Sequence, residues 1–423
     1  MPRPSRRQHL ESVLLMLQER DNSRRQELEE YPCMAEESES TASQSPIYDG
    51  FVEEGGGDAI LRLTNITPRE LNTLWMSVRA HVTRHWNVRR GRCSVYKGKD
   101  VLFMLLVMMK NGGTWEMLSS IFHAKTPTFI KTITGFIRAI APSLYDDWVA
   151  EKTQEETMRM LVTLGNTFVY HPCALYATDV TFQQANRPAG NMDEALPFYS
   201  PKHKLYGYKV EVSVSLRGFA INCTEHARGN TPNITMFRHN EAFHHATRRK
   251  SNEDRSLWDV GLINTEYPNE WAVLTDKGYQ GVEQHVRCIH STKGSNPTAA
   301  VAQQNADISS DRISVENWFG RLFGLWSICA DKYRWGEDLY DDIFQTCAAL
   351  TNYHIGYYPL RSTNGDECCQ RQNRLVSIGR EMQKKRRRAQ DRYRERRRLR
   401  QRMSLEDRAC SEGSDDDEDL TQL

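Results

Sequence analysis

The stretch "ALYATDVTF" at residues 174–182 marks the point where the chain changes from a helical to an extended pattern. It predicts a β-strand with a carboxylate, Asp179, at its centre. Apolar and polar residues then alternate along "YKVEVSVSL" at 208–216, which is the period of a strand. The dipeptide "RG" at 217–218 predicts a hairpin turn, after which "FAINCTE" at 219–225 runs back.

The next part of the chain alternates between helix and strand. A short buried strand, "WAVLTD" at 271–276, ends on a second carboxylate, Asp276. We expect a helix over about 280–287, a strand near 288–291 and a long amphipathic helix from about 310 to 326. This order predicts an α/β fold of the RNase H-like type, in which a mixed sheet is flanked by helices.

Before the sheet, from about residue 62 to 165, the pattern is all-helical. "TPRE" at 67–70 is a capping box that begins a helix, and Thr114 can cap a later one. Two short helices joined by the turn "HAKT" at 123–126 predict a helix-turn-helix, although an ordinary helical bundle would give the same pattern. The predicted recognition helix offers to solvent Thr128, Lys131, Thr132 and Arg138.

The composition indicates an intracellular protein. The chain has 423 residues, 39% of them hydrophobic and 26% charged, which suits a soluble globular centre. The 10 cysteines form no CxxC pair, so we expect reduced thiols of the cytosol or nucleus. The longest apolar run, at 101–110, is too short to cross a bilayer, and "MPRPSRRQHL" at the start lacks the apolar core of a signal peptide. We therefore expect no membrane association.

The net charge of +1 hides a strong local segregation of charge. Twelve Lys and Arg residues fall within 384–402, against Asp391 and Glu395, and an acidic tail follows. The basic run has helix-forming composition and could be a nuclear address, a phosphate-binding arm or both. The alternative is a solvated helix without a partner. The acidic tail could also compete for the basic run within the same chain.

Three carboxylates lie within or beside apolar segments, where burying a charge costs free energy. Asp179 lies within a strand, Asp276 ends another, and Glu316 lies on a helix beside Val315 and Trp318. At Asp276 alone, capping of a turn would be explanation enough. Buried acids need a partner, and three acids close together would repel one another unless a cation lay between them. Mg²⁺ prefers carboxylate oxygens, and two such ions about 4 Å apart can drive phosphodiester cleavage.

Several sequence blocks, taken in order, resemble a PIF/Harbinger-type transposase with its DDE endonuclease domain. The resemblance extends from about residue 98 to 355 and includes an upstream helix-turn-helix, "TWEMLSSIFHAKTPTFIKTI" at 114–133. The blocks are "DVTFQQANRP" at 179–188, "FYSPKHKLYGYKVEVSVSLRGFAINCTEHARGN" at 198–230, "LTDKGYQG" at 274–281 and "RISVENWFGRLFG" at 312–324.

The resemblance implies a nuclear enzyme whose catalytic and metal-binding residues are Asp179, Asp276 and Glu316, with Mg²⁺ or Mn²⁺ as cofactor. Such an enzyme cleaves DNA at element ends and joins the freed 3′-hydroxyl to target DNA. It also implies a Myb-like DNA-binding partner, and we allow for a homo-oligomer. One position departs from the family: Asn233 stands about where an Asp is usual. The alternatives are a domesticated nuclear DNA-binding protein and a scaffold for a Myb-like partner, both without cleavage.

On this basis we divide the chain into four parts and name the basic residues that could contact DNA phosphates. The parts are a disordered acidic N-terminal segment (1–58), a helical region with the helix-turn-helix (59–168), a DDE RNase H-like endonuclease domain (169–362), and a basic helix or arm with an acidic tail, largely disordered (363–423). Simple solubility is the alternative role for the strand lysines. The candidate DNA contacts are Lys131, Arg138, Lys202, Lys204, Lys209, Lys277, Arg312, Arg386, Arg387 and Arg388.

Overall fold

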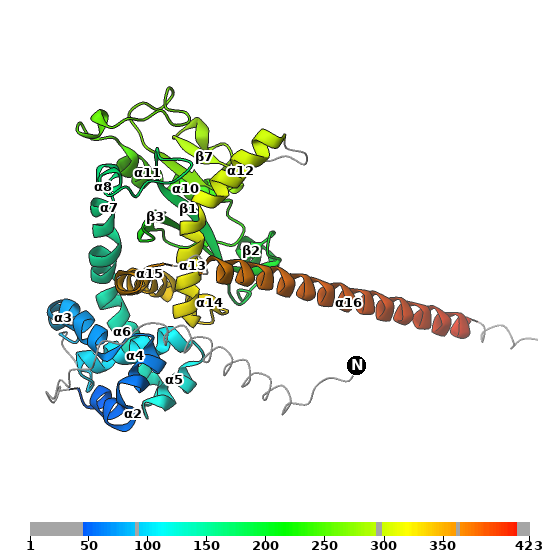
Figure 1. The fold of residues 1–423 in the computed structure, drawn as a ribbon. Helices are drawn as coiled ribbons and strands as arrows, with labels where there is room; N and C mark the ends of the chain where they lie inside the picture. Colours follow the sequence, from blue (N-terminus) through cyan, green and yellow to red (C-terminus); the bar gives the residue numbers. More distant parts are fainter. Residues whose placement is uncertain (1–44, 89–92, 293–297, 361–363, 413–423) are drawn as a thin grey trace, which may run out of the picture. The chain divides into compact units, whose positions relative to one another are not determined.

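The structure is a computed structural model (Figure 1), in which residues 45–88, 93–292, 298–360 and 364–412 are described, with the backbone alone for 364–367, 369 and 401–412. The expectation of disorder for residues 1–44 and for the acidic tail after 412 therefore lies outside the described residues. None of the described helices combines the length and apolar character needed to cross a bilayer.

The helical region begins with the predicted capping box. Thr67 Oγ1 accepts a hydrogen bond from the Glu70 amide (3.3 Å), and Glu70 Oε2 accepts one from the Thr67 amide (2.9 Å). Thr114 caps a later helix, as predicted, and the helix before it ends at Asn111 with Gly112 as its C-cap. The helices of this region are α2 (Pro46–Thr64), α3 (Pro68–His85), α4 (Gly98–Asn111), α5 (Trp115–Ile121), α6 (Thr126–Tyr145), α7 (Glu151–Glu155) and α8 (Met158–Thr163).

Two expectations for this region were wrong. Residues 46–58 are not disordered but form the first part of α2, because Asp100 of α4 accepts hydrogen bonds from the amides of Ile47 and Tyr48 at 3.1 and 3.0 Å. The window is polar on average, yet its few apolar side chains pack on α4. Thr132 of α6 is buried rather than exposed, because it lies on the same helix face as the core residue Phe129.

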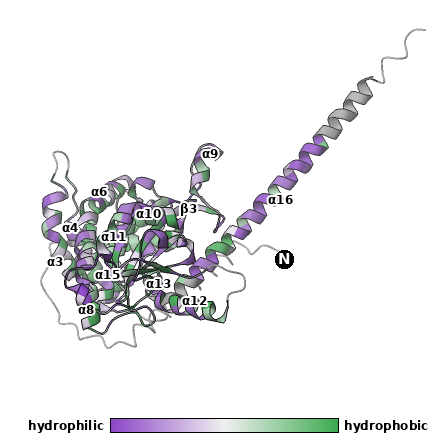
Figure 2. Ribbon diagram, turned by 90° about the horizontal axis from the view of Figure 1, so that it is seen from above, coloured by the Kyte–Doolittle hydropathy of each residue, from purple (hydrophilic) through white to green (hydrophobic). Residues whose placement is uncertain are grey.

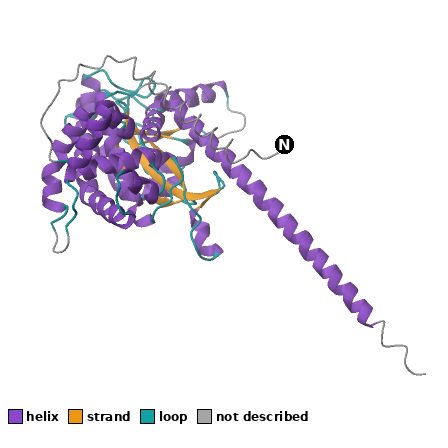
Figure 3. Cartoon of the chain, turned by 90° about the horizontal axis from the view of Figure 1, so that it is seen from below, coloured by secondary structure: helices purple, strands orange, loops and turns teal. Residues whose placement is uncertain are grey.

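The sheet is mixed, as predicted, and its strands run in the order β2-β3-β1-β6-β7. β3 is antiparallel to β1, β6 is parallel to β1, and β7 is parallel to β6. β4 returns along β3 after the predicted turn, where Gly218 has φ +84°. Figure 3 shows these strands among the helices. The strands are β1 (Ala174–Gln184), β2 (Tyr199–Ser200), β3 (Leu205–Ser215), β4 (Ala220–Cys223), β5 (Ala227–Arg228), β6 (Ala272–Thr275) and β7 (Cys288–His290).

Helices cover both faces of the sheet, because alternate strand residues enter different hydrophobic clusters. Ala272 and Leu274 join a large cluster that includes α13, α15 and the N-terminal helices, whereas Val273 between them joins a smaller cluster with α8 and α10. The large cluster crosses the predicted border near residue 168, and the described residues from Ser45 onward form one compact unit. The four-part division of the chain therefore stays a prediction.

The remaining helices differ from expectation in detail. The helix predicted at 280–287 is replaced by two 3₁₀ turns, η4 (Lys277–Tyr279) and η5 (Val282–Gln284), because Gly281 between them has φ +103°. The long helix predicted from 310 to 326 is two helices that meet at Arg312. The helices are α9 (Met192–Ala195), α10 (Asn233–His239), α11 (Glu241–Arg248), α12 (Ala299–Asp311), α13 (Ile313–Leu325), α14 (Ser327–Ala330), α15 (Tyr340–Tyr357) and α16 (Asn364–Glu412).

The basic run is helical, as its composition suggested, and belongs to α16. Residues 364–412 were expected to be largely disordered, so this part of the expectation was wrong. The first part of α16 packs along α13, where Leu375 is buried against Phe182 and Leu205. Beyond residue 380 the described side chains are almost all exposed, and Figure 2 shows this stretch as hydrophilic. Packing at its base anchors a helix whose later part has no apolar face.

Candidate active site

The two predicted aspartates lie at neighbouring parallel strands, Asp179 within β1 and Asp276 directly after the end of β6. Ala177 of β1 pairs with Leu274 of β6, and Asp179 and Asp276 each lie two residues further along. The side-chain period of a strand is two, so both acids point to the same face as this apolar pair. That face belongs to the large hydrophobic cluster, on the side that α13 covers.

Glu316 reaches the same place from the first turn of α13. The helix is held on β1 and β3 by buried neighbours that include Val315 and Phe319. Burial raises the pKa of Glu316 above its ordinary value; Arg312 opposes this rise, whereas the charges of Asp179 and Asp276 add to it. The three predicted acids therefore belong to one electrostatic cluster, although they come from three separate elements.

Arg312 is the positive member of this cluster. Its Nη2 lies 2.8 Å from Asp179 Oδ2, and its Nη1 lies 3.7 Å from Asp276 Oδ1. Its side chain is 6% exposed, and a contact between Arg312 and DNA stays a prediction. Burial raises the pKa of Asp179, Arg312 lowers it, and Asp276 raises it further.

The donor set fits a divalent cation in its chemistry. Three carboxylates supply the hard oxygen ligands that Mg²⁺ and Mn²⁺ prefer. Among the residues described, no three Asp, Glu, His or Cys side chains are already gathered as a ready set of metal ligands. The cationic group that now contacts Asp179 and Asp276 is the guanidinium of Arg312.

A buried polar network behind the acids was missed by sequence reasoning. Tyr279, three residues after Asp276, donates a hydrogen bond to Glu211 Oε2 at 3.2 Å. Glu211 lies on β3, fully buried, and its Oε1 is 3.1 Å from both Asn240 Nδ2 and His244 Nε2. Burial lowers the pKa of His244, and Glu211 opposes that shift. The network anchors the turn that follows Asp276.

The sequence contains the residues of this network, but their burial becomes evident only when the arrangement of the sheet and its covering helices is known. Glu211 looks like one of the solvent-facing polar residues of "YKVEVSVSL". In the structure it pairs with Val180 of β1 and lies under α10 and α11, so its face of the sheet is covered.

Lys209 and Asn233 lie beside the same turn. Lys209 Nζ donates to the Thr231 carbonyl at 2.7 Å and to Asn233 Oδ1 at 3.4 Å. A Cβ added at Gly278 would lie 3.1 Å from Asn233 Nδ2. Burial, followed by the nearby charge of Lys202, lowers the pKa of Lys209 to about 8. The position that departs from the family pattern thus contacts both a partly buried lysine and the turn after Asp276.

A small pocket beside Asp179 lies between β1 and the first part of α16. Its lining includes Phe182, Lys202 and His203 on one side and Arg371 on the other. The ring of His203 stacks on Phe182 with centroids 4.5 Å apart, and burial lowers the pKa of His203 to about 4. Within the described structure its buried Nδ1 has no hydrogen-bond partner.

The base of α16 is docked at this pocket by close contacts. Arg371 lies 3.7 Å from the ring centroid of Phe323 and donates to the carbonyls of Cys329 and Ala330. A Cβ at Gly379 would lie only 1.8 Å from the carbonyl oxygen of His203, so the helix backbone touches that turn. These contacts at the base of α16 therefore fix where the basic stretch of the helix begins relative to the pocket.

The other predicted DNA contacts are spread over the molecule. Lys131, Lys202 and Lys277 are exposed, and Lys204 is partly exposed. Arg138 forms an ion pair with Asp338 at 2.5 Å, so its charge is already partnered. On α16, all three predicted arginines, Arg386, Arg387 and Arg388, are exposed, and the first lies 5.5 Å from the ring of Tyr206.

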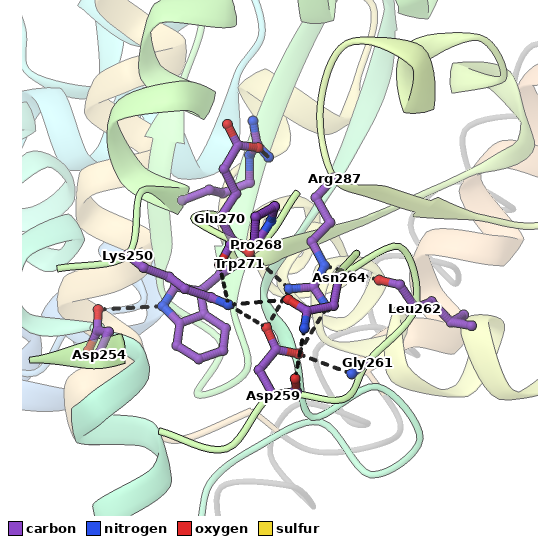
Figure 4. A network of polar contacts seen from close by, with 11 residues as sticks. Lys250, Asp254, Asp259, Gly261, Leu262, Asn264, Pro268, Glu270, Trp271 and Arg287 are labelled. Carbon is purple, nitrogen blue, oxygen red and sulfur yellow. Dashed lines mark hydrogen bonds and ion pairs between the residues drawn. The ribbon is translucent and has the colours of Figure 1, made fainter. Parts of the chain in front are cut away.

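A second polar network supports the sheet away from the acids (Figure 4). Arg287, just before β7, binds Asp259 through both terminal nitrogens, at 2.5 and 2.9 Å, and Lys250 binds the same carboxylate at 2.6 Å. Burial opposes ionisation of Asp259, but these hydrogen bonds outweigh it and lower the pKa to about 2. The network ties the loop between α11 and β6 to the sheet and leaves Trp258 and Val260 exposed.

The arrangement of sheet, helices and acids indicates the class of the fold. A mixed sheet flanked by helices, with two aspartates on adjacent parallel strands and a glutamate from a covering helix, is an RNase H-like α/β nuclease fold. The family model described as "DDE superfamily endonuclease" matches residues 178–352, a stretch that contains all three acids. No curated protein and no solved structure matches the chain. The match supports a nuclease or transposase domain at the superfamily level.

Proposed function

We propose that the protein is a metal-dependent DNA endonuclease of the DDE type that acts as a transposase. It would cleave phosphodiester bonds at the ends of a mobile element and join the 3′-hydroxyl to target DNA. The observation that carries this proposal is the pairing of β1 with β6, which brings Asp179 and Asp276 to one face of the sheet, under the helix α13 that carries Glu316, inside the matched region.

In this proposal the three acids would hold Mg²⁺ or Mn²⁺. A bound divalent ion supplies an activated water or 3′-hydroxyl and stabilises the charge on the leaving oxygen. The chain itself orients the DNA. Lys277 follows Asp276 directly, and Lys202 lines the pocket with Asp179, so both are suited to contact the phosphates that flank the cleaved bond.

The basic stretch of α16 would add sequence-independent affinity. Arg387 and Arg388 are exposed, and the helix that carries them is docked beside the catalytic pocket at Gly379. Contacts between arginines and phosphates release counterions, so such binding depends strongly on salt. The same basic run supports nuclear localisation. A Myb-like partner and a homo-oligomer rest on the sequence resemblance alone.

One observation favours a second candidate, a nuclear DNA-binding protein or Myb-partner scaffold without cleavage. The exposed basic stretch of α16 could bind DNA by charge alone, whatever the three acids do.

The test is cleavage of supercoiled plasmid by the full chain in Mg²⁺ or Mn²⁺, compared with Asp276→Ala. We expect nicking by the wild type only when the ion is present, no nicking by the variant, and retained DNA binding in both. Equal cleavage by both proteins would show that Asp276 is not catalytic. No cleavage by either, with binding retained, would favour the second candidate. An oligonucleotide with a free 3′-hydroxyl, offered with a target plasmid, tests strand transfer separately.

A further inference from the structure

The acids of the candidate site share a cationic side chain that comes from the protein itself. Arg312 Nη2 and Nη1 approach Asp179 Oδ2 and Asp276 Oδ1 at 2.8 and 3.7 Å. Glu316 follows Arg312 by four residues, which is one helical turn. One guanidinium therefore contacts both aspartates, at the start of the helix α13 that carries Glu316.

The environment of Arg312 makes its charge dependent on the neighbouring acids. Its side chain is 6% exposed, and its buried Nε has no hydrogen-bond partner within the described structure. A guanidinium stays charged at any ordinary pH, and a buried charge is tolerated only beside opposite charges. Arg312 and the acids therefore depend on each other.

The oxygens that Arg312 approaches are those that a shared cation would need. Asp179 Oδ1 accepts a hydrogen bond from the Val180 amide at 2.7 Å, and Asp179 Oδ2 accepts one from Arg312. Both oxygens of this carboxylate are therefore engaged. A divalent ion bound between Asp179 and Asp276 would also be repelled by a guanidinium in direct contact with both residues.

We propose that Arg312 is a built-in counter-cation, which holds Asp179 and Asp276 together before metal binds and gives up these contacts when the metal arrives. The inference rests on the proposed metal-dependent function and adds a positioning residue to it. Arg312 thus stabilises the metal-free protein and weakens the binding of metal, because the same carboxylates serve both cations.

Because Arg312 would stabilise the metal-free protein and also weaken metal binding, its proposed role can be distinguished from a purely structural role. A residue that only supports the fold would, when removed, weaken folding and metal binding together. A competing cation would, when removed, weaken the metal-free fold but tighten metal binding. Coupling between two interacting groups of a protein typically changes the affinity for a ligand about 5–150-fold.

The experiment measures Mn²⁺ binding to the full chain without DNA, by calorimetry, together with thermal unfolding in EDTA and in Mn²⁺. The variants are Arg312→Gln and Arg312→Lys, the second of which keeps the charge but loses the two-pronged geometry. The matched control is Arg248→Gln, because Arg248 is also fully buried and paired with one acid, Glu270, at 2.8 Å.

We expect Arg312→Gln to unfold at a lower temperature than the wild type in EDTA and to bind Mn²⁺ about tenfold more tightly. Added Mn²⁺ should therefore raise the unfolding temperature of this variant by more than it raises that of the wild type. Arg312→Lys should have an unfolding temperature and a Mn²⁺ affinity between those of the wild type and Arg312→Gln. This variant also keeps the test usable if the glutamine variant does not fold. Arg248→Gln should lose stability without a change in Mn²⁺ affinity. Unchanged or weaker Mn²⁺ binding by the Arg312 variants would overturn the proposal.

Failure of the proposed function would look different. Wild-type protein that binds no Mn²⁺, or binds it equally well after Asp179→Asn, would remove the metal site and the inference with it. Wild-type binding that depends on Asp179, without a gain in the Arg312 variants, would leave the metal site standing and overturn the counter-cation alone.

Discussion

Asp179 and Asp276 lie two residues beyond Ala177 and Leu274, which are paired in parallel strands β1 and β6. Their side chains therefore face the same side of the sheet, where α13 brings Glu316. Residues that are about 100 positions apart in the chain become neighbours through strand pairing. The predictions below test the groups that hold this arrangement.

The buried Glu211 should be the main anchor of the turn after Asp276. Glu211→Gln keeps the shape of the side chain but removes the charge that accepts from Tyr279, Asn240 and His244. We expect a loss of about 3 kcal/mol in the free energy of unfolding, measured with denaturant. Faster amide exchange over residues 276–281 should accompany the loss.

Tyr279→Phe is the matched variant for this network, because it removes a single donor to Glu211. We expect a smaller loss, about 1 kcal/mol, with the rest of the network intact. If the two variants cost the same, or neither costs anything, the network does not anchor the turn.

Glu316 should make the metal-free protein sensitive to pH. Burial raises the pKa of Glu316 above its ordinary value, so the folded protein binds a proton there more tightly than the unfolded chain does. Its stabilising contribution is thus fully present below the unfolded pKa, about 4.3, and is lost as the pH rises through the folded pKa.

Glu316→Gln should therefore stabilise the protein in EDTA at neutral pH, by an amount on the order of 1 kcal/mol, the size of an ordinary single substitution. The gain should shrink as the pH falls towards about 4. Denaturant unfolding at several pH values measures it, with the exposed glutamate variant Glu225→Gln as control. A gain that is the same at every pH would contradict this account of Glu316.

The contact between α16 and the turn at His203 should be intolerant of any side chain. A Cβ at Gly379 would lie 1.8 Å from the His203 carbonyl oxygen, so Gly379→Ala must displace backbone. We expect a loss of about 2 kcal/mol and faster protease cleavage near the base of α16. Gly356→Ala on α15, where a Cβ meets no atom within 4 Å, should instead stabilise by up to about 1 kcal/mol. Equal stabilities of Gly379→Ala and Gly356→Ala would contradict a close contact between α16 and the turn at His203.

The arginines of α16 should govern the salt dependence of DNA binding. Replacing Arg387 and Arg388 together by alanine should weaken binding to all DNA sequences alike. The slope of log affinity against log salt should fall by about 1 for each residue, as measured by fluorescence anisotropy. The control removes two exposed arginines elsewhere, Arg249 and Arg255, and should leave the slope unchanged. Equal slopes in all three proteins would rule out α16 as a phosphate-binding arm.

The sequence by itself determined the elements and the acids. Local patterns predicted the capping box at Thr67, the hairpin turn at Gly218 and the strands that carry Asp179 and Asp276, because these features depend on neighbouring residues. Periodicity also indicated which face of each element is apolar. Carboxylates within or beside apolar segments, together with the resemblance of the surrounding sequence blocks to the transposase family, selected the candidate site.

The tertiary structure alone decided what each charged side chain does. Arg312 and Glu211 looked like solvent-facing residues in the sequence, yet one pairs with the candidate catalytic acids and the other is the hub of a buried network. Likewise, α2 forms over residues 46–58 because α4 lies beside them. Local sequence sets which groups an element presents, but burial and ion pairing depend on neighbours that only folding brings together.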